Sequence, residues 1–510
     1  MDMRQGKIMS QVHELYVVDM GIDTHQEPVA YMRSDCHICR AEGFTASSRI
    51  LLTHGKNSMI ATLNVVDDKV LPPKSAGLSK IAMHQLNVID GVAIKVSHAP
   101  VNTSLAAVRK KIFGHRLTHQ EIQDVVEDIS AHRYSDIEIA SFLSVCAGSR
   151  LDVDEIIGLT QAMVTCGKRL YWPGQPRVFD KHCIGGLPGN RTSPLVVSII
   201  SAAGLTIPKT SSRAITSPAG TADTMEALTP VNLDLADIQR VVAKTHACLA
   251  WGGAVNLSPA DDLLIRIERV LDLDGEGQLI ASVLSKKIAA GSTHVVIDIP
   301  VGPTAKVRSQ EDADRLALLF TQVGEACGIH IRCLITDGSQ PIGAGIGPVE
   351  EARDVLAVLQ SSDTAPQDLR DRALFLAAHL FAIAFEETYA QGLARATAIL
   401  DEGKAWQQFQ RILAAQGGMK NLSEAQYQHT ETSQITGTLV AIDNRQLSRL
   451  AKLAGAPATA AAGVRLHKRV GDNIQIGEPL FTLYSDTAGE QQYAMSYYRQ
   501  SEIFTIEVAR

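Results

Sequence analysis

The stretch FDKHCIGGLPGNRTSP, residues 179–194, stands between two apolar runs of the chain. The run before it predicts a strand that ends at Val178-Phe179, and the run from Leu195 to Ala203 predicts a helix. Ser193 has the side chain of an N-cap, and Pro194 suits the first helical position because its φ is already helical and it has no N–H to leave unpaired. The stretch therefore predicts a loop that joins a strand to a helix.

This loop has the features of an anion site. Gly185, Gly186 and Gly189 leave the backbone free to turn its amides toward a ligand, and the amides of the first helical turn have no partner within the helix. Phosphate is the simplest anion for such a site. The loop is not a Walker A motif, because its glycine spacing differs and Arg191 stands where that motif has lysine. We therefore expect a phosphate site in an enzyme other than an NTPase.

A second loop of the same kind follows one predicted strand later. Residues 205–209 predict the strand, KTSSRAITSPAGT (209–221) contains the loop, and residues 222–228 predict a helix with Thr221 as its cap. Successive parallel strands end at the same edge of a sheet, so the two loops should converge on one crevice. The cations predicted along this edge are Lys181, Arg191, Lys209 and Arg213. Together the two loops predict a phosphate-handling site.

The predicted fold class is multidomain α/β. From about residue 175 apolar strands alternate with helices of ten to fifteen residues, which is typical of a parallel sheet. Four domains are predicted: an N-terminal β-rich domain (1–97), a helical domain (98–175, with a later segment near 245–290), an α/β phosphate-binding domain (176–430) and a C-terminal α+β domain (431–510).

Local patterns give the individual elements. In the N-terminal domain, strands are predicted at 15–18, 49–53, 59–65 and 91–96. Capping boxes at Thr118 and Asp152 begin two helices. In the α/β domain, strands are predicted at 294–299 and 330–335 and helices at 309–327, 349–360 and 369–385. The polar stretch 421–433 is interpreted as a linker.

Composition excludes several classes of protein. A formal charge of −7 over 510 residues argues against a dedicated nucleic-acid or membrane surface, and no apolar run reaches the roughly 18 residues of a membrane span. The first twenty residues are too polar for a secretory signal, so a cytoplasmic location is expected. Of the eight cysteines, only Cys36 and Cys39 form a C-x-x-C, and without a second ligand pair they are interpreted as structural.

Three motifs resemble those of one family. DKHCIGGLPGNRTS (180–193) is similar to the D-K-H-S-x-G-G-V-x-D-x-T-S signature of the thymidine/pyrimidine-nucleoside phosphorylases. SSRAITSPAGT (211–221) resembles that family's S-G-R-G-x-x-x-T-G-G-T stretch, and ASVLSKK (281–287) its A-S-I-L-S-K-K helix. The N-terminal β-rich segment and WGGAVNL (251–257) resemble the longer branch, which includes the type 2 thymidine phosphorylases and the AMP phosphorylases.

The resemblance implies a reaction and an assembly. In phosphorolysis inorganic phosphate displaces a base from C1′ of a nucleoside, here thymidine, to give thymine and 2-deoxyribose 1-phosphate. Such a reaction needs a compensated phosphate dianion and stabilisation of the departing base, and it needs no metal or redox cofactor, since phosphate is a co-substrate. The expected partners are a small nucleoside or nucleotide and phosphate. A homodimer or larger homo-oligomer is also implied, with no nucleic-acid polymer and no membrane.

The resemblance also implies site residues. The implied phosphate ligands are Lys181, Gly186, Ser193, Ser211 and Thr221. Those implied at the base and sugar are His182, Arg266, Ser282 and Lys286. His182 is the candidate general acid, because an unperturbed imidazole has a pKa close to neutral. Three positions depart from the signature and have no interpretation at this point: Cys183, Asn190 and Arg191.

Two alternatives within this chemistry stay open. The first is a nucleoside 5′-monophosphate (AMP-type) phosphorylase that yields free base and ribose 1,5-bisphosphate. The resemblance then implies Asp274 as the proton donor to the base, and as nucleotide contacts Ser212, Arg213, Ala214, Ile215, Thr216, Ser217 and Lys306. The second is an anthranilate-type phosphoribosyltransferase, for which Asp223 and Glu226 are the candidate magnesium-binding acids.

A non-catalytic alternative treats the C-terminal domain as a carrier module. VGDNIQIGEPL (470–480) resembles half of a biotinyl or lipoyl hairpin. No lysine stands at the expected turn, so the domain is interpreted as structural.

Overall fold

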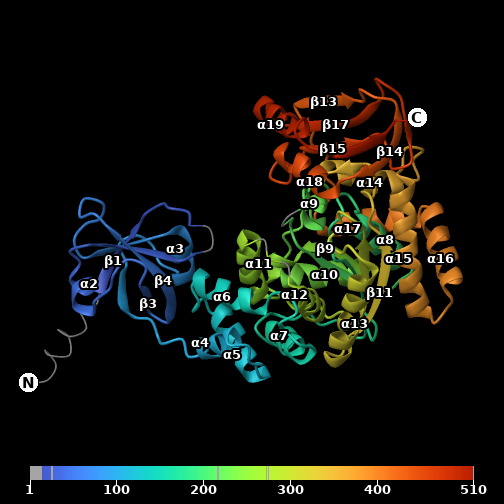
Figure 1. Ribbon diagram of the computed structural model, residues 1–510. Coiled ribbons are helices and arrows are strands. Elements are labelled where there is room, and N and C mark those ends of the chain that lie inside the picture. The colour runs from blue at the N-terminus through green and yellow to red at the C-terminus, as the bar shows by residue number, and fades with distance from the viewer. Residues whose placement is uncertain (1–13, 25–26, 215–216, 272, 274, 509–510) are drawn as a thin grey trace, which may run out of the picture. The chain divides into compact units, whose positions relative to one another are not determined.

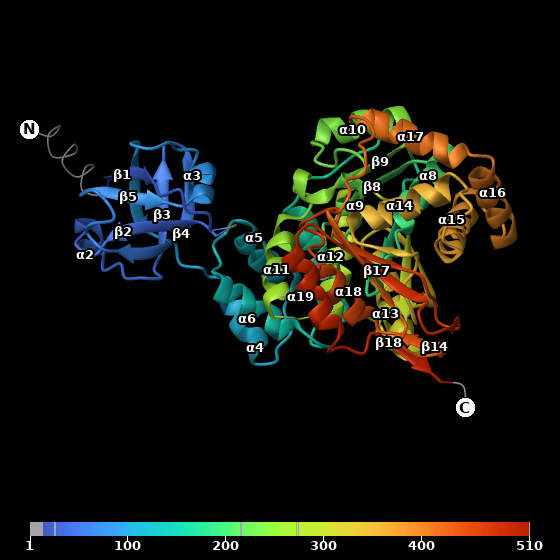
Figure 2. The ribbon, with the colours of Figure 1, turned by 90° about the horizontal axis from the view of Figure 1, so that it is seen from above.

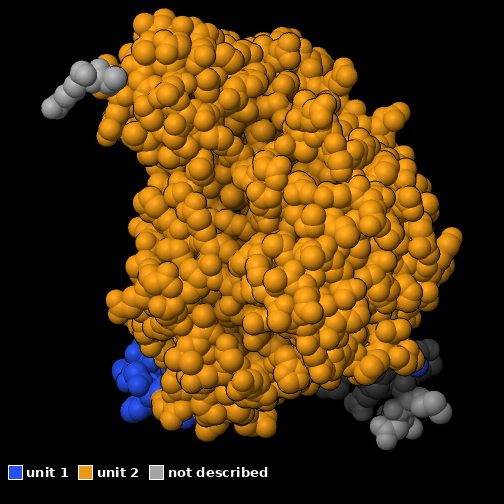
Figure 3. All heavy atoms as spheres, turned by 90° about the vertical axis from the view of Figure 1, so that its right-hand side faces the viewer, with its two compact units in different colours: residues 1–115, 124–145 blue, residues 116–123, 146–510 orange. Residues whose placement is uncertain are grey.

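The computed structural model describes residues 14–24, 27–214, 217–271, 273 and 275–508 (Figures 1 and 2). These residues belong to two compact units, which Figure 3 colours separately. The first unit comprises residues 1–115 and 124–145, and the second comprises residues 116–123 and 146–510. Each unit is described by itself below.

A closed six-stranded barrel forms the first part of unit 1, with the strand order β1-β5-β2-β4-β3-β6. Alternate residues such as Leu15 and Val17 point inward and are almost fully buried, as expected for a strand with one face in the core. The strands are β1 (Glu14–Asp19), β2 (Val29–Arg33), β3 (Arg49–His54), β4 (Asn57–Val66), β5 (Ser75–Leu78) and β6 (Ala93–His98). The pattern predicted four of them and missed β2 and β5, which close the barrel.

Helices complete unit 1. Short helices α2 (His37–Glu42) and α3 (Lys80–Leu86) pack on the barrel, and Cys36 and Cys39 lie in the barrel core with Met32. Beyond the barrel lie α4 (Leu105–Ile112) and α6 (Asp136–Cys146). Helix α5 (His119–Ser130) belongs partly to each unit. The predicted capping box at its start is confirmed, since the Glu121 amide donates to the Thr118 hydroxyl and the Thr118 amide donates to the Glu121 carboxylate.

Parallel strands form the centre of unit 2. The order β11-β10-β7 is parallel throughout, and β8 pairs with β9 in parallel. A parallel bridge between Val178 and Thr206 joins the two groups. The strands are β7 (Phe179–Cys183), β8 (Ile207–Ser211), β9 (Ala247–Trp251), β10 (His294–Val301) and β11 (His330–Asp337). The predicted parallel α/β arrangement is therefore confirmed.

Helices cover these strands. Helix α8 (Thr192–Ala202) is buried along nearly its whole length among β8, β9, α15 and α17, while α13 lies on β10 and β11. Helix α12 packs against α7, and both also contact α13. The other helices of this region are α7 (Val153–Thr165), α9 (Thr221–Glu226), α10 (Leu235–Thr245), η1 (Gly252–Val255), α11 (Pro259–Leu271), α12 (Glu276–Ala289), α13 (Gln310–Ala326), α14 (Pro348–Leu359), α15 (Gln367–Phe385), α16 (Tyr389–Asp401) and α17 (Lys404–Gln416).

Two antiparallel sheets and two helices form the C-terminal part (Figure 1). One sheet has the order β12-β15-β17-β13 and the other β16-β14-β18. Strand β12 comes just before α14, so this sheet borrows a strand from the α/β region. The elements are β12 (Gly345–Ile346), β13 (Tyr427–Thr432), β14 (Gly437–Ile442), α18 (Asn444–Leu453), β15 (Gly463–Leu466), β16 (Asn473–Ile474), β17 (Pro479–Ser485), α19 (Ala488–Tyr498) and β18 (Phe504–Glu507).

The prediction of a linker at 421–433 is wrong, because this segment contains β13. The sequence YQHTET has no apolar face, and its residues are exposed or half-buried, so periodicity could not identify this edge strand. Its pairing with β17 holds it in place. The multidomain α/β fold class itself is confirmed.

No single helix among the described residues is long and apolar enough to cross a membrane. Helices α15 and α16 pass such a test only as a pair, by length and composition, and they are bent by 117° where they join. Much of α15 lies buried in the core of the α/β region.

Candidate active site

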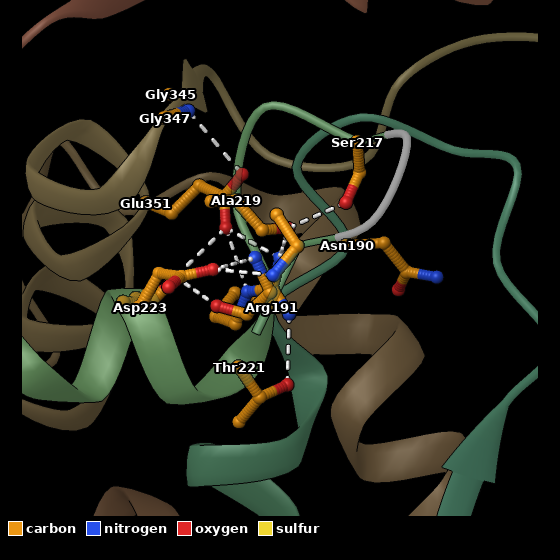
Figure 4. A network of polar contacts seen from close by, with 12 residues as sticks. Asn190, Arg191, Ser217, Ala219, Thr221, Asp223, Gly345, Gly347 and Glu351 are labelled. Atoms are coloured by element: carbon orange, nitrogen blue, oxygen red, sulfur yellow. Dashed lines mark hydrogen bonds and ion pairs between the residues drawn. The ribbon is translucent and has the colours of Figure 1, made fainter. Parts of the chain in front are cut away.

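Two loops follow the ends of adjacent parallel strands in unit 2. Loop A (residues 184–191) joins β7 to α8, and loop B, described at residues 212–214 and 217–220, lies between β8 and α9. Arg191 of loop A donates to the Thr221 hydroxyl over 2.8 Å and to the Ala219 carbonyl over 2.9 Å, so the loops are in contact (Figure 4). The predicted convergence of the two loops is confirmed.

The helix starts differ by one or two residues from the prediction. Helix α8 begins at Thr192 with Arg191 at the cap position, and no side chain there caps the helix, so the Ser193 cap is wrong. The cause is the left-handed turn at Asn190, whose φ is 49° and which completes the loop earlier. Helix α9 begins at Thr221 itself, so the Thr221 cap is also wrong. Both hydroxyls thus lie in the first helical turn, beside free amides.

Lys181 is fully buried at the end of β7. Its exposed fraction is 1 %, and its Nζ donates to the Thr192 hydroxyl over 2.6 Å. Burial lowers the pKa of this lysine, because a charged amine is poorly solvated there. Thr192 lies beside Ser193 in the first turn of α8, so this lysine points along the strand toward the helix N-terminus.

A second cluster of buried charge surrounds Asp180. Lys209 Nζ lies 3.4 Å from one of its oxygens and Lys287 Nζ lies 2.8 Å from the other. Burial opposes charge on Asp180, but the two lysines outweigh it and lower the pKa of the carboxyl. For Lys209, burial dominates and lowers the pKa to about 7, with Asp180 opposing the shift and Lys287 adding to it. The cluster carries an excess of cationic groups over carboxylates.

His182 stands among these cations. Burial and the positive charges of Lys287, Lys209 and Lys181 place the pKa of His182 well below its ordinary value. The prediction for His182 started from the unperturbed pKa of imidazole, and lysines that other strands and helices bring close lower that pKa here. A neutral imidazole can still donate one N–H to a base carbonyl. Extra negative charge at the site would favour its protonation.

The residues implied for the base lie on α11 and α12. Lys286 Nζ lies 2.5 Å from the buried Asp261 carboxylate and 3.5 Å from the Ser282 hydroxyl. Burial opposes the charge of Lys286, but Asp261 outweighs it and raises the pKa of the lysine. The charge of Lys286 also lowers the pKa of His182, so the residues implied for the base lie near those implied for phosphate. Arg266 lies on α11, facing partly out of the core.

Many polar groups of loop B form ion pairs and hydrogen bonds with one another and with helix α9. Arg213 pairs with Glu226 and Asp223 and lies over the Trp251 ring at 4.8 Å. Asp223 accepts the amides of Ala214 at 2.6 Å and Gly220 at 2.9 Å. Both carboxylates proposed for magnesium in the phosphoribosyltransferase alternative are therefore engaged. Ser212 is exposed and the Ser217 hydroxyl donates to Ala219, while Ile215, Thr216 and Asp274 lie outside the described residues.

A cavity of about 470 Å³ opens beside loop B. Its lining combines the paired side chains of loop B and α9 with cations from α11 and α18: Arg213, Asp223, Glu226, Arg269 and Lys452. Burial and the charge of Arg269 lower the pKa of Lys452, so the two cations are neighbours. The cavity is suited to an anionic group.

Cys183 and Asn190, two of the departures from the signature, touch one another. The Asn190 amide donates to Cys183 Sγ over 3.3 Å across loop A. Burial raises the pKa of the Cys183 thiol to about 12, so it is not a thiolate at neutral pH. Cys183 thus stands where the family signature has serine. Its sulfur is a weak acceptor that helps hold the left-handed turn at Asn190.

Lys306 lies against loop A. A Cβ added to Gly186 would lie 2.3 Å from the Lys306 amide nitrogen, so the two backbones are packed as closely as glycine permits. Ser211 ends β8, and its hydroxyl is buried without a hydrogen-bond partner among the described residues.

Comparisons with known proteins match family models from residue 105 onward and relatives over most of the chain. Three family models match in order: the glycosyl transferase family helical bundle domain at residues 105–167, the glycosyl transferase family a/b domain at 175–406, and the pyrimidine nucleoside phosphorylase C-terminal domain at 438–503. Relatives are similar over nearly their full length. "Putative thymidine phosphorylase 1" of Acidovorax sp. (strain JS42) is 56% identical over 93% of this chain and 93% of its own. The chain belongs to the thymidine/pyrimidine-nucleoside phosphorylase family.

A further relative agrees with this assignment, and solved structures share the fold. "Putative thymidine phosphorylase" of Polaromonas sp. (strain JS666 / ATCC BAA-500) is 54% identical over 95% of both chains. Anthranilate phosphoribosyltransferase from Thermus thermophilus is 20% identical, with a TM-score of 0.50 over 61% of this chain and 98% of that one. The enzyme from Saccharomyces cerevisiae gives the same TM-score of 0.50 at 15% identity, over 62% of this chain and 98% of its own. These two structures show a shared fold.

As a member of the phosphorylase family, the chain is a pentosyltransferase. Sequence reasoning missed three side chains that shape its site. In the sequence, Lys287 is the second lysine of the ASVLSKK motif and Asp180 is the neighbour of Lys181, and no separate role was predicted for either. Glu351 gave no signal, because a glutamate in an amphipathic helix usually faces solvent. Its exposed fraction is 1 %.

Two adjacent glycines of this family member offer a matched test of loop A. Gly185 and Gly186 have φ values of 93° and 91°, but a Cβ at Gly185 meets nothing within 4 Å. We expect Gly185→Ala to cost about 1–2 kcal/mol from backbone strain alone. Gly186→Ala adds a clash with Lys306, for a total of about 2–5 kcal/mol. Urea unfolding measures both, and equal losses would contradict the close packing.

The low pKa of Lys209 predicts that the KM for phosphate depends on pH. This lysine is protonated below its pKa of about 7 and loses its proton above it, while a bound dianion favours the charged form. Binding must then take up a proton, so we expect the KM for phosphate to rise by up to about tenfold per pH unit above this pKa. Steady-state assays between about pH 7.5 and 9 measure it. Lys209→Arg should flatten the profile, and an unchanged slope in that variant would contradict the assignment.

Proposed function

We propose that the enzyme catalyses the phosphorolysis of thymidine to thymine and 2-deoxyribose 1-phosphate. The observation that carries the proposal is the charge at the strand ends. Lys209 and Lys287 share the single carboxylate of Asp180, and Lys181 donates to a neutral hydroxyl, all three lysines being at most 3 % exposed. Buried cations in excess over carboxylates are costly unless an anion compensates them. The names of the relatives support thymidine as the substrate.

The geometry supports separate roles for the residues that would bind phosphate and those that would stabilise the departing base. Lys181, the first turn of α8 and the hydroxyls of Ser211 and Thr221 would hold phosphate so that one of its oxygens faces C1′ of the sugar. That oxygen forms the new bond to C1′ as the C1′–N bond breaks, through an oxocarbenium-like state. The base departs with the bonding electron pair. Its negative charge would be met by the N–H of His182 and by Lys286 before it takes up a proton.

One observation favours a second candidate, a nucleoside 5′-monophosphate phosphorylase. Loop B adjoins the cavity lined by Arg269 and Lys452, and the backbone of Lys306 packs on Gly186 of loop A. Such cations suit a 5′-phosphate, which a nucleoside lacks. In this case the product is ribose 1,5-bisphosphate.

One assay separates the two candidates. The enzyme is incubated with phosphate and thymidine, uridine, AMP or CMP, and release of the free base is followed by chromatography. Thymidine turnover at least about tenfold above that of the others in kcat/KM, equivalent to about 1.4 kcal/mol, is expected for the first candidate. Preferred turnover of AMP or CMP would establish the second. No turnover of any of the four would refute both.

We also propose that the enzyme is a homodimer or larger homo-oligomer in the cytoplasm. The family resemblance supports the assembly. Light scattering on the purified enzyme measures the assembly, with a mass of at least twice 54.9 kDa expected. A monomeric mass at micromolar concentration would contradict it.

A further inference from the structure

Arg191 makes contacts that no phosphate ligand is expected to make. Its side chain is 11 % exposed, and both Nε and Nη2 lie 2.6 Å from one oxygen of Glu351 (Figure 4). Its other donors reach Thr221 and Ala219 at the end of loop B. One guanidinium thus connects loop A, loop B and helix α14.

Glu351 compensates the charge of Arg191. It is almost fully buried, and it also accepts the Thr224 hydroxyl at 3.0 Å and the Gly347 amide at 3.3 Å. A guanidinium paired in this way has no net charge to offer a phosphate. Its role is therefore geometric.

The contact with Thr221 fixes the direction of a hydroxyl. A guanidinium has only donors, so Thr221 Oγ1 must accept the hydrogen bond from Arg191 Nη1. The hydroxyl hydrogen of Thr221 then points away from Arg191 and stays free to donate. A phosphate oxygen accepts from such a hydrogen, whereas a hydroxyl turned the other way would repel it.

We propose that Arg191 is a positioning residue that orients the Thr221 hydroxyl as a donor to phosphate. This inference rests on the proposed phosphate role of Thr221. It assigns one of the departures from the family signature to substrate binding through a neighbouring residue.

A double-mutant cycle tests the inference. Lysine keeps the charge next to Glu351 but cannot reach Glu351, Ala219 and Thr221 together. We expect Arg191→Lys to raise the KM for inorganic phosphate by at least about fivefold, with the nucleoside KM changed by less than about twofold. Thr221→Val should raise the phosphate KM by about tenfold or more. The double variant should match Thr221→Val within about twofold, because Arg191 acts through the lost hydroxyl.

The same helix supplies the control. Arg465 pairs with Glu350 over 2.6 Å and with Asp354 over 3.1 Å, a buried arrangement on α14 that touches neither loop. Arg465→Lys should leave the phosphate KM within about twofold of the parent. Equal effects of Arg191→Lys and Arg465→Lys, or effects of Arg191→Lys and Thr221→Val that multiply in the double variant, would overturn the inference.

Two further measurements keep the test decisive. Where Arg191→Lys does not fold, the double variant Arg191→Met with Glu351→Met removes both charges with side chains of similar size, and the same rise in phosphate KM is expected. Where no nucleoside is turned over, the proposed function fails, but the shift of Tm by inorganic phosphate still reports binding. Arg191→Lys should then reduce that shift relative to Arg465→Lys, and an undiminished shift would overturn the inference.

Discussion

Replacing Asp180 by asparagine is expected to lower the free energy of unfolding by about 3–5 kcal/mol. The carboxylate is fully buried and is shared by Lys209 and Lys287, so the substitution leaves two buried amines without their counter-charge. Asparagine keeps the size of the side chain, which isolates the electrostatic effect. The midpoint of urea unfolding at neutral pH measures the loss.

An exposed ion pair provides the control for Asp180→Asn. Asp401 lies 2.7 Å from Arg370, but its side chain is 50 % exposed, so Asp401→Asn should cost less than about 1 kcal/mol. The loss in Asp180→Asn should shrink as the pH rises. Buried lysines deprotonate at lower pH than lysines of the unfolded chain, so the unfolded state binds more protons in this range and stability increases with pH. If Asp180→Asn lowered the free energy of unfolding no more than Asp401→Asn does, the predicted cost of leaving Lys209 and Lys287 without a counter-charge would be contradicted.

Replacing Lys181 by methionine is expected to lower kcat/KM for phosphate by about 10³-fold or more, equivalent to about 4 kcal/mol. The amine is buried beside the first turn of α8, where the proposed function places the phosphate dianion. Methionine fills a similar volume without a polar atom, so the folded state should keep its stability. Steady-state kinetics at saturating nucleoside measure the loss.

The expected combination for Lys181→Met is lost activity with an unchanged Tm. Lys468→Met is the matched control, because Lys468 pairs with Glu478 over 2.7 Å in the C-terminal part. Its kinetic constants should stay within about twofold of the parent. A Lys181→Met variant with kcat/KM within about threefold of the parent would contradict the phosphate role of this lysine.

Local signals predicted the two loops well. Glycine, proline and hydroxyl residues between apolar runs indicated that strands give way to helices here, and the alternation of elements indicated a parallel sheet. The predicted strand end at Phe179 is wrong, because β7 continues to Cys183 through polar residues that carry no strand pattern. These features depend on neighbours in the sequence. The same patterns placed the start of α8 at Pro194 instead of Thr192, because nothing local shows that Asn190 adopts a left-handed turn.

Long-range contacts were beyond the sequence. Arg191 and Glu351 are 160 residues apart, and no pattern in either segment indicates their pairing. The pKa of His182 depends on lysines from β8 and α12, so a neutral-range value was assumed where the fold lowers it. The barrel strands β2 and β5 and the edge strand β13 likewise depend on partners distant in sequence.

The borrowed strand β12 limits how this enzyme can be divided. Gly345 and Ile346 pair with Arg465 and Val464. Helix α14 begins two residues later, and its first turn contains Glu351, which holds Arg191. Deleting the chain after residue 430 would strip β12 of its sheet and leave Glu350 and Asp354 without Arg465. The C-terminal part is therefore no detachable accessory. Domain exchange between relatives would have to move it together with α14.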